Sequence, residues 1–227
     1  MIKNNKKNVS VCKILKNSLL FLPFFLLPAY ASAAVAVTSH AANTGSGTFS
    51  FNCSGGNYLL LAEQTQTGFP SMGTPTYNGV NMTQLVSVTG SPFGQLWGLA
   101  SPASGSNTVD PQYTGSDSGR TGVEVICLSG VSGVGTGQEL HGWPIASGAD
   151  KSLTDTNAVA GDMFVAFAWD GNNATISSSS STQQDYITPY GQMWSFTQSG
   201  VTSMPWHTNQ SGSSYGAFVG VNVVGIH

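Results

Sequence analysis

The sequence predicts an all-β protein: an antiparallel two-sheet sandwich, jelly-roll-like, with about nine or ten strands. Three observations support this prediction. Apolar and polar residues alternate in short segments along most of the chain. Glycine, proline and serine separate these segments, and glycine alone provides 28 of the 227 residues. No apolar pattern with the period of a helix extends far enough to predict a long helix.

The first 33 residues have the layout of a secretory signal peptide. Five of the seven basic residues precede a short apolar stretch over residues 19–27, and Ala31-Ser32-Ala33 follows it. A basic start, a short apolar core and small residues at a cleavage point are the three parts of such a leader. We therefore expect residues 1–33 to be removed on export, and residues 34–227 to form a single β-sandwich domain.

An uncleaved membrane anchor is the competing interpretation of the leader, because the apolar stretch extends over residues 19–37. Pro23 and Pro28 argue against an anchor, since each removes a backbone donor and leaves an acceptor unpaired inside lipid. We expect a secreted protein or one held at the cell surface, with the periplasm as the alternative location. No membrane insertion is expected after cleavage.

The charge balance after export limits the partners of this protein. Without residues 1–33, only Arg120 and Lys151 oppose ten acidic residues. Two basic side chains cannot neutralise a row of phosphates, so nucleic acid and anionic membranes are not expected as partners. The remaining surface is rich in neutral hydrogen-bonding residues, as in many exposed extracellular proteins.

Two cysteines remain after export, and they are expected to meet an oxidising compartment. Cys53 ends an alternating segment in which it shares a face with Phe51. Cys127 shares a face with Val125 in a second such segment. Both sulfurs should point inward and form a disulfide, which in the chain-entropy model contributes about 4 kcal/mol for a loop of about 75 residues. Two separately buried thiols are the alternative.

Most strands follow from local patterns. A turn at Gly55-Gly56 precedes residues 58–65, which open with Tyr-Leu-Leu-Leu, apolar on both faces and therefore central in a sheet. Residues 74–83 form a predicted hairpin, because Asn78-Gly79 supplies the two positive φ angles of a type I′ turn. Further strands are predicted for residues 85–88, 95–100, 108–113, 122–131, 163–169, 192–197 and 215–224.

Some stretches have weaker strand signals. Pro111 places residues 108–113 at a sheet edge, because proline cannot donate to a neighbouring strand. Residues 132–161 predict a long loop over one end or face of the sandwich. Residues 177–181 predict a solvated tip of low complexity.

Three short motifs follow one another along the chain: Thr76-Tyr77-Asn78-Gly79-Val80, Leu96-Trp97-Gly98-Leu99 and Gly161-Asp162-Met163. They resemble the TYNGV hairpin, the LW strand and the GD strand entry of a group of β-sandwich domains in secreted bacterial and phage-associated proteins. The resemblance covers about residues 57–224. It implies a jelly-roll-like or immunoglobulin-like sandwich with no established activity, and it offers no catalytic residue to carry over.

Catalytic and metal-ligating motifs are weak, and we predict no catalytic, cofactor-binding or metal site. Gly212-Ser213-Ser214-Tyr215-Gly216 fits the nucleophile elbow of hydrolases, but a strand pattern follows it where the elbow requires a helix. Glu139 and His141 could face one side of an extended segment, and residues 170–173 could offer oxygens to calcium. A polar loop and an Asp-Gly turn explain the same residues.

Two tryptophans are candidate ligand platforms. Exposed aromatic rings have an apolar face on which a sugar ring can stack. Trp143 and Trp206 lie in sequence that contains Gly, Pro and His, which predicts loops. Anchors that fasten these loops to the sandwich are the alternative interpretation. Three further tryptophans lie in alternating segments and are expected in the core: Trp97, Trp169 and Trp194.

These patterns predict an exported, non-catalytic protein with a structural or interaction role at the cell surface, in an extracellular assembly or in a virion-like particle. The expected partners are further copies of the chain or another surface protein. A carbohydrate-binding module with a glycan ligand is the second interpretation, and a hydrolase is the third. The valine-rich residues 217–224 are the candidate strand for pairing between subunits, unless they complete the core of the monomer.

Overall fold

The structure is a computed structural model. It describes residues 33–65, 71–88, 93–114, 121–145, 150–170, 176–177, 181–187, 192–208 and 214–227. The chain divides into two units, Met1–Tyr30 and Ala31–His227, and every described residue belongs to the second unit. The predicted signal peptide lies outside the described residues except for Ala33, so its removal stays a prediction.

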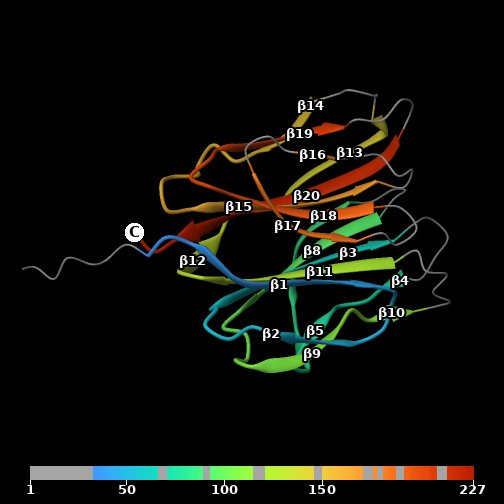
Figure 1. The fold of residues 1–227 in the computed structure, drawn as a ribbon, viewed down its shortest axis with the longest axis vertical. Helices are drawn as coiled ribbons and strands as arrows, with labels where there is room; N and C mark the ends of the chain where they lie inside the picture. Colours follow the sequence, from blue (N-terminus) through green and yellow to red (C-terminus); the bar gives the residue numbers. More distant parts are fainter. Residues whose placement is uncertain are drawn as a thin grey trace, which may run out of the picture. The chain divides into compact units, whose positions relative to one another are not determined.

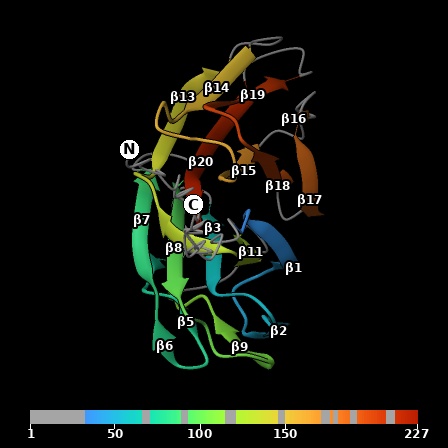
Figure 2. The ribbon, with the colours of Figure 1, turned by 90° about the vertical axis from the view of Figure 1, so that its left-hand side faces the viewer.

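The described residues form antiparallel sheets stacked in four layers (Figure 1), and a view turned by 90° shows the same order of layers (Figure 2). We number these layers sheets 1 to 4. The all-β antiparallel sandwich predicted from the sequence is confirmed. The stack is nevertheless larger than two sheets, because two further sheets cover the outer faces of the central pair.

Backbone pairing between neighbouring strands defines the order of strands within each sheet. Sheet 1 contains β2 (Phe49–Asn52), β9 (Ser106–Asp110), β5 (Thr76–Tyr77) and β6 (Val80–Asn81). Sheet 2 contains β1 (Ala36–Thr44), β11 (Thr121–Ser129), β3 (Tyr58–Thr65), β8 (Phe93–Ala100) and β7 (Thr83–Val88). Sheet 3 contains β12 (Val131–Val134) and β13 (Gln138–Ile145), which both pair with β20 (Ser214–Gly225), then β15 (Met163–Asp170), β18 (Gln192–Ser199) and β17 (Thr182–Ile187). Sheet 4 contains β14 (Asp150–Thr154), β19 (Ser203–Thr208) and β16 (Ile176–Ser177), and a separate pair contains β4 (Ser71–Met72) and β10 (Tyr113–Thr114).

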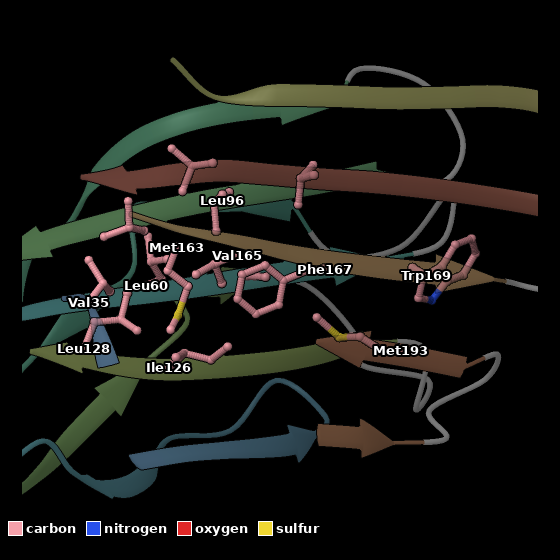
Figure 3. Packing of buried hydrophobic residues seen from close by; sticks show 14 of the residues in the cluster. Val35, Leu60, Leu96, Ile126, Leu128, Met163, Val165, Phe167, Trp169 and Met193 are labelled. Carbon is pink, nitrogen blue, oxygen red and sulfur yellow. The ribbon is translucent and has the colours of Figure 1, made fainter. Parts of the chain in front are cut away.

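Three hydrophobic cores fill the spaces between the four sheets. The largest lies between sheets 2 and 3, where Ile126 and Leu128 of β11 face Val165 and Phe167 of β15 (Figure 3). Each fully buried side chain of this size contributes about 1.5–3 kcal/mol relative to an exposed one. The stack is therefore stabilised mainly by this core and by its two smaller neighbours.

The central strands of the two middle sheets are buried on both faces. Every described residue of β15 is buried, and in β3 the residues from Leu59 onward are buried too. Successive side chains of a strand point to opposite faces, so Leu59 and Leu61 enter the core with sheet 1 while Leu60 enters the core with sheet 3. The prediction that Tyr-Leu-Leu-Leu marks a central strand is confirmed, since β3 lies between β11 and β8.

The predicted hairpin and the predicted disulfide are both present. Asn78 and Gly79 have φ angles of 53° and 74° between β5 and β6. Cys53, just after β2, is bonded to Cys127 near the end of β11, with 5.5 Å between their Cα atoms. The disulfide therefore ties sheet 1 to sheet 2 across the core that these sheets share.

The stretch of residues 132–161 is a correction to the sequence analysis. We predicted a long loop, and the structure places β12, β13 and β14 there. The alternation is interrupted in this stretch by glycines, and β13 pairs with β20 through a register shift between Gly142 and Ile145. These strands are held by a partner far away in the sequence, so their local pattern is weak.

The predicted edge strand of residues 108–113 is an interior strand, which is a second correction, and the structure decides between the two interpretations of residues 217–224. β9 lies between β2 and β5, and Pro111 follows the end of the strand, so it interrupts no pairing. β20 lies between β15 on one side and β12 with β13 on the other. Val221 and Val223 are fully buried in the core between sheets 2 and 3. Residues 217–224 therefore complete the core of the monomer and offer no free edge to a second subunit.

Gly56 provides a test of the packing around the disulfide. A Cβ atom at this position would collide with Cys127 Sγ and lie 2.9 Å from the carbonyl oxygen of Leu128. We predict that Gly56→Ala lowers the free energy of unfolding by about 1–3 kcal/mol, because a backbone strand and a bridged sulfur cannot move aside. Gly47→Ala is the matched control, since a Cβ atom there has no neighbour within 4 Å. Equal urea midpoints for the two variants would contradict this prediction.

Candidate functional site

A cleft of about 520 Å³ lies where the connection from β12 to β13, the segment after β14 and the end of β20 meet. Its lining is mostly polar and uncharged, with threonine hydroxyls, Gln138, Asn157 and Asn222. Two carboxyl groups, those of Asp155 and Asp162, also line it. An arrangement of this kind offers many hydrogen bonds to a ligand in a small volume.

Asp162 organises the cleft because its carboxylate accepts hydrogen bonds from residues on either side of it in the sequence. Its Oδ1 accepts from the backbone nitrogen of Gly225 at 2.9 Å and from Nε2 of His227 at 2.9 Å. Its Oδ2 accepts from the backbone nitrogen of Val159 at 3.0 Å and from Nδ2 of Asn222 at 3.1 Å. These four bonds join the turn before β15 to the end of β20.

The same four bonds keep Asp162 ionised. Burial by itself raises the pKa of the Asp162 carboxyl, but hydrogen bonds from Gly225, Val159, Asn222 and His227 favour the charged form and together hold the pKa below its ordinary value. A depressed folded-state pKa stabilises the fold at pH values above the unfolded-state pKa. This contribution is lost as the pH falls through the lower, folded-state pKa.

Asn222 presents an unsatisfied acceptor at this cleft. An ionised carboxylate can only accept, so the amide of Asn222 must direct its NH₂ group toward Asp162 and its Oδ1 elsewhere. Asn222 is 2% exposed, and its Oδ1 has no hydrogen-bond partner among the described residues. Buried polar atoms are rarely left unpaired, because the loss of their hydration costs about 1–3 kcal/mol.

Gly135 keeps the wall of the cleft open beside Asn222. A Cβ atom on Gly135 would lie 2.8 Å from Oδ2 of Asp155 and 3.7 Å from Cβ of Asn222. The backbone nitrogen of Gly135 also donates to the carbonyl oxygen of Asn222 at 2.8 Å. Two oxygen acceptors therefore flank a position that has no side chain of its own. The sequence analysis did not predict this site, although Asp162 belongs to the Gly161-Asp162 motif that it identified as a strand entry.

The ligand platforms predicted from the sequence are only partly described. Trp143 lies in β13 and Trp206 lies in β19, so both belong to strands, whereas the sequence predicted loops. The backbones are thus placed in sheets 3 and 4. The side chains of Trp143 and Trp206 lie outside the described part of the structure, and their role as platforms stays a prediction.

The hydrolase motif is not an elbow in this fold. Ser214 begins β20, and the residues after it continue that strand, as the sequence analysis expected. The side chain of Ser214 and residues 171–173 of the suggested calcium loop lie outside the described residues. Among the described residues, no group of three or more His, Cys, Asp or Glu side chains is arranged to hold a metal ion.

A second polar feature closes the side of the stack where the edge strands β1 and β17 approach one another. Nδ1 of His40 on β1 donates to Oδ2 of Asp185 on β17 at 2.8 Å. The backbone nitrogen of Asp185 donates to Oγ of Ser195 at 3.1 Å. Glu124 lies on β11, the strand next to β1 in sheet 2, and is fully buried.

Glu124 holds its proton at neutral pH. Burial raises the pKa of Glu124 to about 8, the Ser195 hydroxyl opposes this shift, and the charge of Asp185 adds to it. The carboxyl group lies close enough to Ser195 for the hydroxyl to affect its pKa. Neither carboxyl oxygen, however, has a hydrogen bond of ordinary geometry with a described residue.

Comparisons with known proteins give no relative: no family model, no curated protein and no solved structure matches this chain. In the part of the chain that the structure describes, no helix is long and apolar enough to cross a membrane. The function must therefore be inferred from the geometry of the site.

We predict that Asp162→Asn lowers the free energy of unfolding by on the order of 2 to 4 kcal/mol. The new NH₂ group would replace one carboxylate oxygen and would face two hydrogen-bond donors that it cannot accept from. Urea unfolding at neutral pH measures this change. Asp155→Asn is the matched control, since Asp155 Oδ1 accepts from the backbone nitrogen of Asn157 within one turn. An equal loss in both variants would show that Asp162 does not organise the cleft.

The second expected outcome concerns pH and Glu124. The pKa of Glu124 is raised from 4.5 to about 8 in the folded state. At pH values between these two numbers, the carboxyl group keeps its proton in the folded state and loses it in the unfolded state. Its contribution to stability should therefore decline as the pH rises from about 4.5 to about 8, by up to roughly 1.4 kcal/mol per pH unit. Glu124→Gln should remove that decline. A decline of the same slope in the variant would refute the assignment.

Proposed function

We propose that this protein is an exported, non-catalytic recognition protein that binds a neutral, hydroxyl-rich ligand, such as a glycan, in the cleft beside Asp162. The observation that carries this proposal is the unpaired Oδ1 of Asn222, a residue that lines the cleft: this oxygen is buried and has no partner among the described residues. A hydroxyl group of a ligand would supply the missing donor. Hydroxyl and amide groups along the rest of the lining match further hydroxyls.

The charge of the cleft supports a neutral ligand. Asp155 and Asp162 would repel an anion, and of the described residues that line the cleft only His227 can carry a positive charge. A sugar avoids this repulsion and donates hydrogen bonds to carboxylate and amide oxygens. Val159 is 51% exposed at the cleft and offers an apolar surface to the C–H face of a sugar ring.

The arrangement of groups favours recognition over catalysis. His227 is the described histidine that lines the cleft, and its Nε2 is bonded to Asp162. The described lining contains threonines but neither serine nor cysteine. A hydrolase requires a nucleophile that is hydrogen-bonded to a base, and this base must in turn be hydrogen-bonded to a group that orients it.

The structural or interaction role expected from the sequence is the second candidate, and β17 is the strand that favours it. Tyr186 of β17 is 45% exposed and packs on Trp194 with ring centroids 5.5 Å apart. An exposed aromatic residue on an edge strand can serve as an anchor for a partner. The candidate strand of the sequence analysis, β20, is already enclosed in the monomer.

Binding of mono- and oligosaccharides to the full chain tests this proposal. Glucose, galactose, mannose and N-acetylglucosamine, each with short oligomers, serve as probes in isothermal titration. We predict saturable binding of one member of the panel, weakened about tenfold or more by Asn222→Ala because one hydrogen bond of about 1.4 kcal/mol is lost.

Tyr186→Ala is the control, since its side chain lies on β17 and not in the cleft. The glycan proposal requires that this variant keep the affinity of the wild type. No saturable binding to any probe, together with ordered multimers that Tyr186→Ala dissociates, would replace the glycan proposal by the assembly role.

A further inference from the structure

Three alanines at alternate positions offer two cleavage points at the end of the predicted leader. Ala31 and Ala33 form one pair of small residues at the spacing that a signal peptidase recognises, and Ala29 with Ala31 forms a second pair at the same spacing. Cleavage after Ala33 would make Ala34 the first residue of the mature protein. Cleavage after Ala31 would make Ser32 the first residue and would keep Ala33 in the mature chain.

Ala33 belongs to the folded domain, because its backbone forms an antiparallel bridge with Ile226. The nitrogen of Ala33 donates to the carbonyl oxygen of Ile226 at 3.0 Å, and the nitrogen of Ile226 donates to the carbonyl oxygen of Ala33 at 3.2 Å. The nitrogen of Val35 donates to the carbonyl oxygen of Gly161 at 3.0 Å. Val35 is 5% exposed and packs in the core between sheets 2 and 3. The backbone is therefore fixed on both sides of the bond between Ala33 and Ala34.

Two glycines leave room for the backbone of this segment. A Cβ atom on Gly130 would lie 2.6 Å from the carbonyl oxygen of Ala34 and 3.2 Å from that of Ala33. A Cβ atom on Gly225 would lie 3.3 Å from the same Ala33 oxygen. Close approach of one backbone to another is a common reason for glycine at a position. The domain therefore accommodates Ala33 as closely as it accommodates Ala34.

The bridge between Ala33 and Ile226 also supports the cleft. Ile226 lies between Gly225 and His227, which both donate to Oδ1 of Asp162. The bridge holds the residue between these two donors in place. Loss of Ala33 would remove both hydrogen bonds of the bridge and loosen the chain that carries the two donors.

We propose that a signal peptidase cuts this chain between Ala31 and Ser32, so that the mature protein begins at Ser32 and keeps Ala33. The cut is a hydrolysis: water adds to the carbonyl carbon of Ala31, the peptide bond to Ser32 breaks, the leader leaves with a carboxylate, and the Ser32 nitrogen takes up a proton as the new amino terminus. Ala31 and Ser32 lie outside the described residues, and the proposal depends on the bridge of Ala33. It rests on the proposed export.

The bridge distinguishes the two cleavage points whatever the order of folding and cleavage. Cleavage after Ala33 separates Ala33 from the domain, and the bridge to Ile226 is then lost. Cleavage after Ala31 is compatible with both hydrogen bonds of the bridge and with the bond from Val35 to Gly161. The mature chain that begins at Ser32 therefore keeps all the backbone pairing described for this segment.

Export of the full chain from a bacterial host tests the proposal. Intact mass and N-terminal sequencing of the released protein should give Ser32 as the first residue. The second measurement is the amide hydrogen exchange of Ile226, because this N–H bonds to Ala33 only where Ala33 is retained. We expect the Ile226 amide to exchange about tenfold or more slowly than an unpaired amide.

Ala29→Gln and Ala33→Gln form a matched pair of variants, because each replaces a small residue of one cleavage point and leaves the other point intact. Ala29→Gln should abolish the product that begins at Ser32. Ala33→Gln should give that product in the amount of the wild type. Its longer side chain has room, since Ala33 is exposed and the bridge uses only backbone atoms of this residue.

Three results would overturn the proposal. A released protein that begins at Ala34, or at any residue other than Ser32, would refute the cleavage point and uphold export. A chain that keeps residues 1–31 would refute the cleavage point together with the proposed export. A product that begins at Ser32 but exchanges the Ile226 amide as fast as an unpaired amide would show that the bridge is not the reason for keeping Ala33.

Discussion

The central strands of the two middle sheets are buried on both faces, and this constraint limits where polar side chains can lie. Unpaired polar side chains are unfavourable in a strand that faces a core on each side, because the loss of hydration is not compensated. Glu124 of β11 is an exception, and burial raises its pKa to about 8. The central parts of β3, β11, β15 and β20 are accordingly apolar at nearly every position. Sheets 1 and 4 exist in turn because the outer faces of the middle sheets are apolar and must be covered.

The cleft lies at one end of the central strands, because Asp162 directly precedes β15 and Asn222 lies near the end of β20. Figure 3 shows Leu128 and Met163 at one end of the central core and Trp169 with Met193 at the other. Asp162 directly precedes Met163, so the cleft belongs to the first end. The central core fixes β15 and β20, the strands next to Asp162 and Asn222, and so holds the groups of the cleft in place.

The parts of the fold that could be predicted are those encoded by neighbouring residues. Alternation identified β3 and β11, and Asn78-Gly79 identified its hairpin, because side-chain period and φ preference act over a few positions. The facing of Cys53 and Cys127 also followed from alternation, and their disulfide is present.

The remaining features depend on pairings between distant residues, which local patterns do not encode. β13 was missed because its partner β20 lies many residues away and the glycine-containing segment has no clear period. The cleft was missed for the same reason: Asn222 and Gly225 reach Asp162 across a separation of 60 and 63 residues. Only the Gly161-Asp162 pair gave a local signal, and it indicated a strand entry without indicating the hydrogen bonds that Asp162 accepts.

Recognition of a neutral ligand through the Asn222 amide is the central claim, and NMR observation of that amide tests it most directly. Saccharide added to the full chain should shift the Asn222 side-chain NH₂ resonances and the backbone amide of Gly135 along one saturable curve. The amide resonances of β17 should stay in place. Shifts that are absent from Asn222 and Gly135, or that appear instead on β17, would contradict the assignment of the cleft as the binding site.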